Sequence, residues 1–471
     1  MIFPIFFRRL TILALLSAPL LLNAGAARAG VFNPETFTLA NGMKVVVAPN
    51  HRVPVVTHMV WYKVGSADDP PGKSGAAHLL EHLMFKGTKK MKPGEFSEIL
   101  ARNGGQENAF TSHDYTGYYQ NVAVDRLKMV MELEADRMTN LAFTAKDVET
   151  ERLVILEERR MRTDNDPAGT LREHSNAALY LNHPYRRPVI GWEREIRALE
   201  LADVMSFYKR WYAPNNAILV VAGDITAKQL RPLAEAAYGK IPPVDLSPRA
   251  RPQEPPQAAA RRVTLKDKRV RIPAWSRSFL SPSHGAGDSK LADPLEVLAE
   301  ILGGGATTRL YKALVVDAKL AVSAGASYSP DSMGPTGFSF YASPRPGVSM
   351  EKLEAAMEAQ ITKLLKEGVT KAEVARAKQR MQAQAVYARD SLRTGAQVLG
   401  AALSSGRTVE DVESWPERVG AVTLDQVNAA ARAVFKEGRS VTSLLLPQDK
   451  PQDKPEDKPQ ENHGKNKGAK Q

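Results

Sequence analysis

Two histidines and a glutamate stand together in the segment His78-Leu79-Leu80-Glu81-His82. Residues four apart lie on one face of an α-helix, so this spacing predicts a helix on which both imidazoles can bind a single metal ion. Glu81 lies beside that face, where its carboxylate can reach a water molecule at the metal. The order H-x-x-E-H is the reverse of the H-E-x-x-H zinc-binding helix. Two structural histidines buried on a helix are the alternative interpretation.

The first thirty residues have the features of a secretory signal peptide. Arg8 and Arg9 precede an apolar run, and an A-x-A cleavage site ends at Ala29. We therefore predict that residues 1–29 are removed and that the mature protein is periplasmic in a bacterium. The apolar run is too short to span a bilayer comfortably, so stable membrane insertion is not expected. An uncleaved anchor is the alternative.

Composition and charge limit the class of protein and the kinds of ligand that the chain can bind. The 43% hydrophobic and 25% charged residues are typical of a soluble globular protein, and 471 residues exceed one ordinary domain. The net charge is +12, but the lysines and arginines are spread along the chain and form no stripe with aromatic residues. Nucleic-acid binding is therefore not predicted, whereas a basic surface could favour acidic polypeptides or a membrane surface. The absence of cysteine excludes a thiol nucleophile, a cysteine metal ligand and disulfide bonds.

The chain divides into two halves with similar patterns. A proline-rich passage interrupts every periodicity after about residue 240. On its two sides, Leu127–Thr144 resembles Leu353–Thr370, and each segment leads into a helix that opens with a T-x-x-[DE] capping box. The segment 78–83 can likewise be aligned with 296–301, where the apolar positions match and both histidines are lost.

These repeats predict an α+β fold with two homologous α/β-sandwich domains, related by internal duplication. Each domain is expected to contain an antiparallel-rich sheet with helices packed on one face. The predicted segments are the signal peptide 1–29, an N-terminal domain 30–240 that carries the metal motif, a proline-rich linker 241–262, a second domain 263–446 without the motif, and a disordered low-complexity tail 447–471.

A hydrolytic zinc site needs a third protein ligand and one open position. A predicted helix at 145–162 offers Glu151 and Glu158, which are seven residues apart and lie on nearly the same face. Glu157 competes with Glu158 by spacing alone. Runs of charge usually mark a solvated helix face, and we interpret Glu157, Arg159 and Arg160 in that way.

The chain resembles the inverted-zincin metallopeptidases, the family of pitrilysin, insulin-degrading enzyme and the mitochondrial processing peptidases. In that family the third zinc ligand is a glutamate about 76 residues after the second histidine, preceded by another acid seven residues earlier; Glu158 and Glu151 occupy these positions. The resemblance implies one Zn²⁺ per chain, bound by His78, His82 and Glu158. It also implies that Glu151 supports a ligand by a hydrogen bond.

The same resemblance implies a reaction and a substrate. Glu81 would act as general base on water and then deliver the proton to the leaving amine. Asn108, Ala109 and Phe110 would lie on an edge strand that pairs with the backbone of a peptide. The expected function is zinc-dependent endopeptidase activity on peptides or unfolded polypeptides inside a closed chamber.

One part of the family pattern is missing. Active members use an arginine and a tyrosine, seven residues apart, to bind substrate and stabilise the oxyanion. The corresponding positions of this chain hold Val315 and Val322, which can neither carry charge nor donate a side-chain hydrogen bond. Similar bacterial members divide these functions between two chains, so we predict the zinc subunit of a heterodimer whose partner carries the Arg/Tyr pair. A non-catalytic binding or assembly subunit of the same fold is the alternative.

Overall fold

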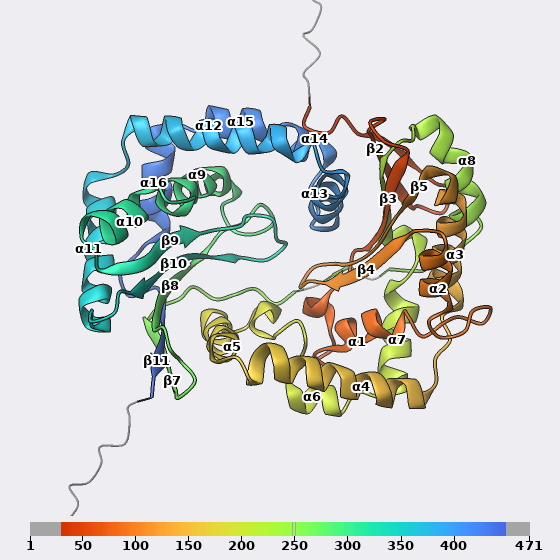
Figure 1. Ribbon diagram of the computed structural model, residues 1–471, viewed down its shortest axis with the longest axis horizontal. Coiled ribbons are helices and arrows are strands. Elements are labelled where there is room, and N and C mark those ends of the chain that lie inside the picture. Colours follow the sequence, from red (N-terminus) through yellow and green to blue (C-terminus); the bar gives the residue numbers. More distant parts are fainter. Residues whose placement is uncertain (1–29, 247, 250, 449–471) are drawn as a thin grey trace, which may run out of the picture.

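The structure is a computed structural model that describes residues 30–246, 248–249 and 251–448. The predicted signal peptide and the predicted tail beyond residue 448 lie outside these residues. Two β-sheets stand on opposite sides of the molecule, each with its own helices (Figure 1). The predicted α+β fold with two similar halves is confirmed. In the described part of the chain, no helix combines the length and the apolarity needed to cross a membrane.

The first sheet has six strands in the order β1-β2-β6-β3-β5-β4. Its β2 and β6 are parallel, all its other pairs are antiparallel, and β4 lies at one edge. The valines of β2 are buried on both faces, which is why this segment is a continuous apolar run. The strands are β1 (Glu35–Thr38), β2 (Lys44–Pro49), β3 (Val55–Tyr62), β4 (Gln106–Thr111), β5 (Thr116–Ala123) and β6 (Ala217–Gly223).

The second sheet repeats this arrangement in the order β7-β11-β8-β10-β9. The parallel pair β7–β11 corresponds to β2–β6, and the edge strand β9 corresponds to β4. The two sheets therefore share strand order and strand direction, as expected from an internal duplication. The strands are β7 (Arg261–Asp267), β8 (Ala274–Ser281), β9 (Ala321–Ser327), β10 (Thr336–Pro344) and β11 (Val441–Pro447).

The helices follow the same duplication, because α3 and α4 come after β5 while α11 and α12 come after β10. Both predicted capping boxes form, with the Thr144 N–H donating to Asp147 (2.7 Å) and the Thr370 N–H donating to Glu373 (2.8 Å). The helices are α1 (Ala76–Leu83), α2 (Glu95–Arg102), α3 (Leu127–Asn140), α4 (Ala145–Arg159), α5 (Pro167–Leu179), α6 (Glu193–Arg197), α7 (Leu201–Trp211), α8 (Ala227–Tyr238), α9 (Ala292–Gly303), α10 (Arg309–Tyr311), α11 (Met350–Glu367), α12 (Lys371–Ala388), α13 (Leu392–Ser404), α14 (Val409–Glu413), α15 (Trp415–Ala421) and α16 (Leu424–Val434).

In addition, one helix of each half packs on the sheet of the other half. Helix α13 packs across β3 and β6 of the first sheet, where Ala396 and Leu399 join Trp61 in one apolar cluster. Helix α5 packs across β7 and β11 of the second sheet, where Leu171 contacts Leu445. Figure 1 shows α13 beside the first sheet and α5 beneath the second. This exchange ties the two halves together and covers the sheet faces that their own helices leave open.

A substitution at Gly400 tests the packing of α13 on the first sheet. A Cβ atom at this position would lie 2.1 Å from the indole ring of Trp61. We expect Gly400→Ala to lower stability by about 1–3 kcal/mol, since the methyl group must displace the helix or the ring. The same change at an exposed helical position is stabilising by up to about 1 kcal/mol. Thermal unfolding measures the difference. Val398→Ala, at a position of α13 that is 40% exposed, is the control and should stay within about 0.5 kcal/mol. A melting temperature of Gly400→Ala at or above that of the wild type would contradict this packing.

Candidate metal centre

Helix α1 carries the H-x-x-E-H segment, and a buried carboxylate fixes its first turn. Gly75 precedes the helix at φ +92°, and a Cβ atom there would lie 2.7 Å from the carbonyl oxygen of Ile190. No side chain of Gly75 can cap the helix, so Asp69 takes this role. Its carboxylate accepts hydrogen bonds from the N–H groups of Gly75 (2.8 Å) and Ala77 (2.9 Å).

The rotation of α1 about its axis is set by burial of its leucines. Leu79, Leu80 and Leu83 are completely buried in the core of the first half. The remaining face therefore carries His78 and His82, whose rings meet edge to face with centroids 4.9 Å apart. The predicted placement of the two imidazoles on one helix face agrees with this geometry.

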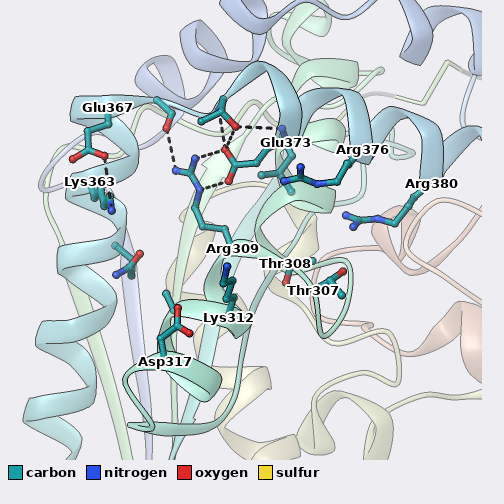
Figure 2. Close-up of a pocket in the computed structure, with 15 residues that line it drawn as sticks. Thr307, Thr308, Arg309, Lys312, Asp317, Lys363, Glu367, Glu373, Arg376 and Arg380 are labelled. Carbon is teal, nitrogen blue, oxygen red and sulfur yellow. Dashed lines mark hydrogen bonds and ion pairs between the residues drawn. The ribbon is translucent and has the colours of Figure 1, made fainter.

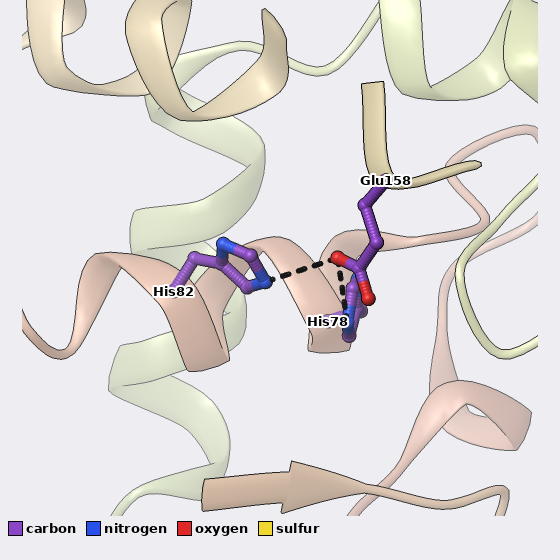
Figure 3. Close-up of side chains that lie close together, drawn as sticks. All are labelled: His78, His82 and Glu158. Atoms are coloured by element: carbon purple, nitrogen blue, oxygen red, sulfur yellow. Dashed lines mark ion pairs between the residues drawn. The ribbon is translucent and has the colours of Figure 1, made fainter. Parts of the chain in front are cut away.

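Glu158, at the end of α4, approaches the same point from a second helix (Figure 3). Its Oε2 atom lies 3.4 Å from Nε2 of His82 and 3.8 Å from Nε2 of His78. One donor atom from each residue lies within 4.8 Å of the others. Atoms that coordinate a tetrahedral zinc ion at about 2.0–2.1 Å are roughly 3.3 Å apart, so the three donors fit an ion of this size.

Glu151 holds His82 from the other side of its ring. Nδ1 of His82 lies 3.2 Å from Oε2 of Glu151, and Lys86 forms an ion pair with the second oxygen of that carboxylate at 2.5 Å. A carboxylate at Nδ1 favours the tautomer that leaves Nε2 free to coordinate. His78 lacks this support, because its Nδ1 is buried without a hydrogen-bond partner among the described residues.

Glu157, the alternative third ligand by spacing, is not part of the donor cluster. Its side chain is 54% exposed and forms an ion pair with Arg160. Glu158 is instead anchored by Arg162, whose guanidinium lies 2.5 Å from Oε1 and leaves Oε2 toward the imidazoles. The solvated-face interpretation therefore agrees with the structure for Glu157 and Arg160. It is wrong for Arg159, which is buried and donates two hydrogen bonds to Glu173, at 2.7 and 2.8 Å.

The protonation of the two histidines differs because their surroundings differ. Burial lowers the pKa of His78 to about 4, so this imidazole is neutral and ready to coordinate. Burial also disfavours charge on His82, but hydrogen bonds to Glu151 and Glu158 outweigh it and raise the pKa to about 9. Without a metal, His82 is thus a cation between two carboxylates. A divalent cation can replace its proton at the same position.

Glu81 faces the cleft from the same helix but is not part of the donor cluster. Burial raises the pKa of the Glu81 carboxyl, although a hydrogen bond from Thr111 opposes the shift. That bond is donated by the Thr111 hydroxyl to Oε2, which leaves Oε1 for another partner. A carboxylate with a raised pKa beside a metal centre suits proton transfer near neutral pH.

The predicted substrate strand lies beside this cluster. Residues 108–111 of β4 line one cleft together with the donor residues, and β4 pairs only with β5 in the described part of the sheet. The Phe110 ring packs against Trp61, with centroids 5.0 Å apart. The N–H of Ala109 donates to the side-chain oxygen of Asn108 at 2.8 Å.

Four residues at the site were not assigned a role from the sequence. Asp69 caps α1, Lys86 pairs with Glu151, Arg162 pairs with Glu158, and Thr111 donates to Glu81. Two of these contacts are local in the sequence, because Arg162 lies one helical turn after Glu158 and Asp69 lies six residues before Gly75. The contacts of Lys86 and Thr111 join segments that are brought together by the tertiary fold.

The second half contains a different cavity, lined by residues of α10, α11 and α12 (Figure 2). Within it, Arg309 donates two hydrogen bonds to Glu373, of 2.8 and 2.6 Å. None of the described residues that line it is a histidine. Nearby, Val315 lies in the turn after α10 and Val322 lies on the edge strand β9, where it is 45% exposed.

Comparison with known proteins places both halves in related families. Residues 44–192 match Insulinase (Peptidase family M16), and residues 198–381 match the Peptidase M16 inactive domain. The chain is 32% identical over 440 residues to the zinc protease PqqE of Helicobacter pylori, which covers 92% of this chain and 98% of that protein. It is also 32% identical over 209 residues to a probable mitochondrial-processing peptidase subunit beta of Schizosaccharomyces pombe, covering 44% of this chain and 46% of that protein.

Solved structures show the same fold. The crystal structure of a protease from Helicobacter pylori superposes with a TM-score of 0.81 at 31% identity, covering 88% of this chain and 99% of that chain. The periplasmic protease PqqL from Escherichia coli superposes with a TM-score of 0.75 at 21% identity, covering 88% of this chain and 47% of that chain. The second likeness concerns the fold alone.

Neighbouring glutamates on α4 provide a matched test of the donor set. We expect Glu158→Gln to weaken zinc affinity more than about 100-fold, because a charged ligand is lost. Glu151→Gln should weaken it about 10–100-fold, as for other partners of ligating histidines. Competition with a chromophoric chelator measures these affinities. Glu157→Gln removes the same charge one residue away and should bind zinc like the wild type; a loss equal to that of Glu158→Gln would contradict the assignment.

Proposed function

This chain belongs to the insulinase family, peptidase family M16, and on that premise we propose that it is a zinc-dependent endopeptidase subunit. The observation that carries the proposal is the meeting of His78, His82 and Glu158 at the free edge of β4, with Glu81 beside them. Its substrates would be peptides or unfolded polypeptides that enter a closed chamber. Relatives that are named zinc proteases support the reaction class.

In this proposal His78, His82 and Glu158 hold one zinc ion through the donor atoms described above. When bound, zinc supplies Lewis-acid chemistry, which acidifies water and polarises a carbonyl group. Glu151 keeps Nε2 of His82 available by holding Nδ1–H. Arg162 keeps the Glu158 carboxylate turned toward the imidazoles.

Glu81 would move the proton in each turnover. Its Oε1 atom takes the proton of the attacking water and later delivers it to the leaving amine. Thr111 holds the other oxygen and so orients the carboxylate. Because Thr111 ends β4, the same strand that would bind the peptide also positions the base.

The peptide would bind as an added strand on β4, using main-chain atoms of Asn108, Ala109 and Phe110. The Ala109 N–H now bonds to the Asn108 side chain at 2.8 Å. A substrate carbonyl oxygen could take over that hydrogen bond, since an amide side chain is a removable acceptor. Binding through the backbone leaves sequence preference to the groups that surround the cleft.

A partner subunit would complete the active site. Val315 and Val322 stand where active relatives of this type carry the arginine and tyrosine that bind substrate and the oxyanion. We therefore propose a heterodimer in which a homologous chain provides that pair. The alternative, a non-catalytic assembly subunit, is less well supported because the complete donor set and Glu81 are present together.

The basic n-region and A-x-A site of residues 1–29 favour export, and we propose a periplasmic location. The fold neighbour PqqL is a periplasmic protease.

Glu81→Gln separates metal binding from chemistry. We expect this variant to bind one zinc ion per chain with wild-type affinity, because Glu81 contributes no donor atom to the cluster. Peptide cleavage should fall by about 100- to 10,000-fold, as expected when a general base is removed. Metal analysis and hydrolysis of a quenched fluorescent peptide check the two parts. Retention of near-wild-type cleavage would rule out Glu81 as the base.

The partner hypothesis is tested by the purified chain alone. We expect it to bind zinc but to cleave peptides at least about 100-fold more slowly than the chain purified with its partner, because the oxyanion donors are missing. Cleavage of the same fluorescent peptide, before and after addition of a homologous subunit that carries the Arg/Tyr pair, measures the difference. Full activity of the lone chain would refute the requirement for a partner.

A further inference from the structure

Arg172 of helix α5 lines the same cleft as residues 108–111 of β4 and the donor residues. Thr163, just before α5, lines it too, and we call the lining formed by Thr163 and Arg172 the α5 wall. Leu171, the neighbour of Arg172, is buried against the second sheet. The orientation of α5 is therefore fixed by packing, and Arg172 is exposed on the cleft side.

Arg172 is a cation without a partner among the described residues, whereas its charged neighbours are all engaged. Arg162 forms its ion pair with Glu158 at 2.5 Å. Asp166 accepts hydrogen bonds from the first turn of α5. Glu173 receives two bonds from Arg159, at 2.7 and 2.8 Å. No acid on this wall remains to neutralise Arg172, so its positive charge faces the path of the peptide.

We infer that Arg172 is a specificity-determining residue, which makes the cleft prefer peptides with an acidic side chain close to the scissile bond. This inference rests on the proposed function and adds a substrate class to it. An extended peptide on β4 presents side chains on both of its faces. A glutamate or aspartate that points toward α5 can form an ion pair with the guanidinium, while a lysine there is repelled.

The walls of the cleft continue beyond Arg172 toward the second half. One helical turn further along α5, Asn176 lines the next cavity together with Ser112 and Tyr115 of the β4–β5 turn. That cavity also contains Ser278 and Ser339 of the second sheet. Two acids line that cavity as well, but each has a cationic partner: Asp114 pairs with Arg251, and Asp331 pairs with Arg407 at 2.5 Å. Arg172 is therefore the charge along this wall that has no partner among the described residues, and it is the position at which the charge of a peptide can be selected.

The size of the preference follows from the exposure of Arg172. Ion pairs of exposed side chains change an equilibrium by roughly two- to fivefold. We expect a preference of this size for Glu over Gln at one peptide position, and a similar disadvantage for Lys. The preference should shrink as salt is added, because the charges are accessible to solvent.

Binding of peptides to the zinc-loaded Glu81→Gln chain, assembled with its Arg/Tyr-bearing partner subunit, tests the inference without hydrolysis. Fluorescence polarisation would compare peptides of one neutral sequence in which Glu, Gln or Lys is placed at each position in turn. We expect Glu to bind more tightly than Gln, and Lys more weakly, at one position or two alternate positions. Adding Arg172→Gln should abolish this order, and adding Arg172→Glu should reverse it. Zinc content and melting temperature confirm that each variant is folded.

Arg194→Glu is the matched control. Arg194 is an exposed arginine of α6 with no partner among the described residues, and its substitution by Glu changes the net charge by the same amount as Arg172→Glu. It should leave the position-dependent order unchanged. If peptides bind but the order is absent, or persists in Arg172→Glu, the inference is overturned while the proposed function stands. If the zinc-loaded complex binds none of the peptides, the proposed substrate site on β4 fails, and the inference fails with it.

Discussion

The position of His82 between two carboxylates of α4 is the contact on which the site depends. Nδ1 meets Glu151 at 3.2 Å and Nε2 meets Glu158 at 3.4 Å, so one imidazole links two helices that are far apart in sequence. The link can form because buried leucines fix the rotation of α1 and Asp69 fixes its first turn. The capping box at Thr144 fixes the start of α4. Helix packing thus sets the donor geometry before any ion binds, which is the preorganisation that a catalytic metal site requires.

The second half has helices that correspond to those of the metal centre, but they carry different side chains. Its α9 and α12 correspond to α1 and α4, but Glu300 of α9 meets Arg380 of α12 at 2.7 Å. The signs of the charges are therefore exchanged between the two helices, and the result is an ion pair that cannot coordinate a cation. Glu296, at the position aligned with His78, bonds to the indole N–H of Trp415 at 2.9 Å. The duplication preserves a polar link between the helices, while the side chains decide whether that link can bind a metal.

Local patterns in the sequence predicted the histidine pair but not the third donor. The i, i+4 histidines and both capping boxes depend on helix geometry alone, so they could be recognised without a fold. Spacing on α4 left Glu151, Glu157 and Glu158 as candidates, and the family resemblance assigned Glu158. Helix ends were less accurate: α4 was expected to run to Arg162 but ends at Arg159, where a π-helical turn to Asp164 begins. The exchange of α5 and α13 could not be predicted, because periodicity shows that a face is apolar but not which sheet covers it. Contacts such as Thr111 with Glu81 depend on that tertiary arrangement and were missed for the same reason.

Anomalous diffraction at the zinc absorption edge, from crystals of the zinc-loaded chain, tests the central claim most directly. We expect one strong peak per chain within coordinating distance of Nε2 of His78, Nε2 of His82 and a carboxylate oxygen of Glu158, with Glu151 bonded to His82 and Lys86 rather than to the ion. A peak at another position, or a site in which Glu158 has turned away from the imidazole pair, would contradict it.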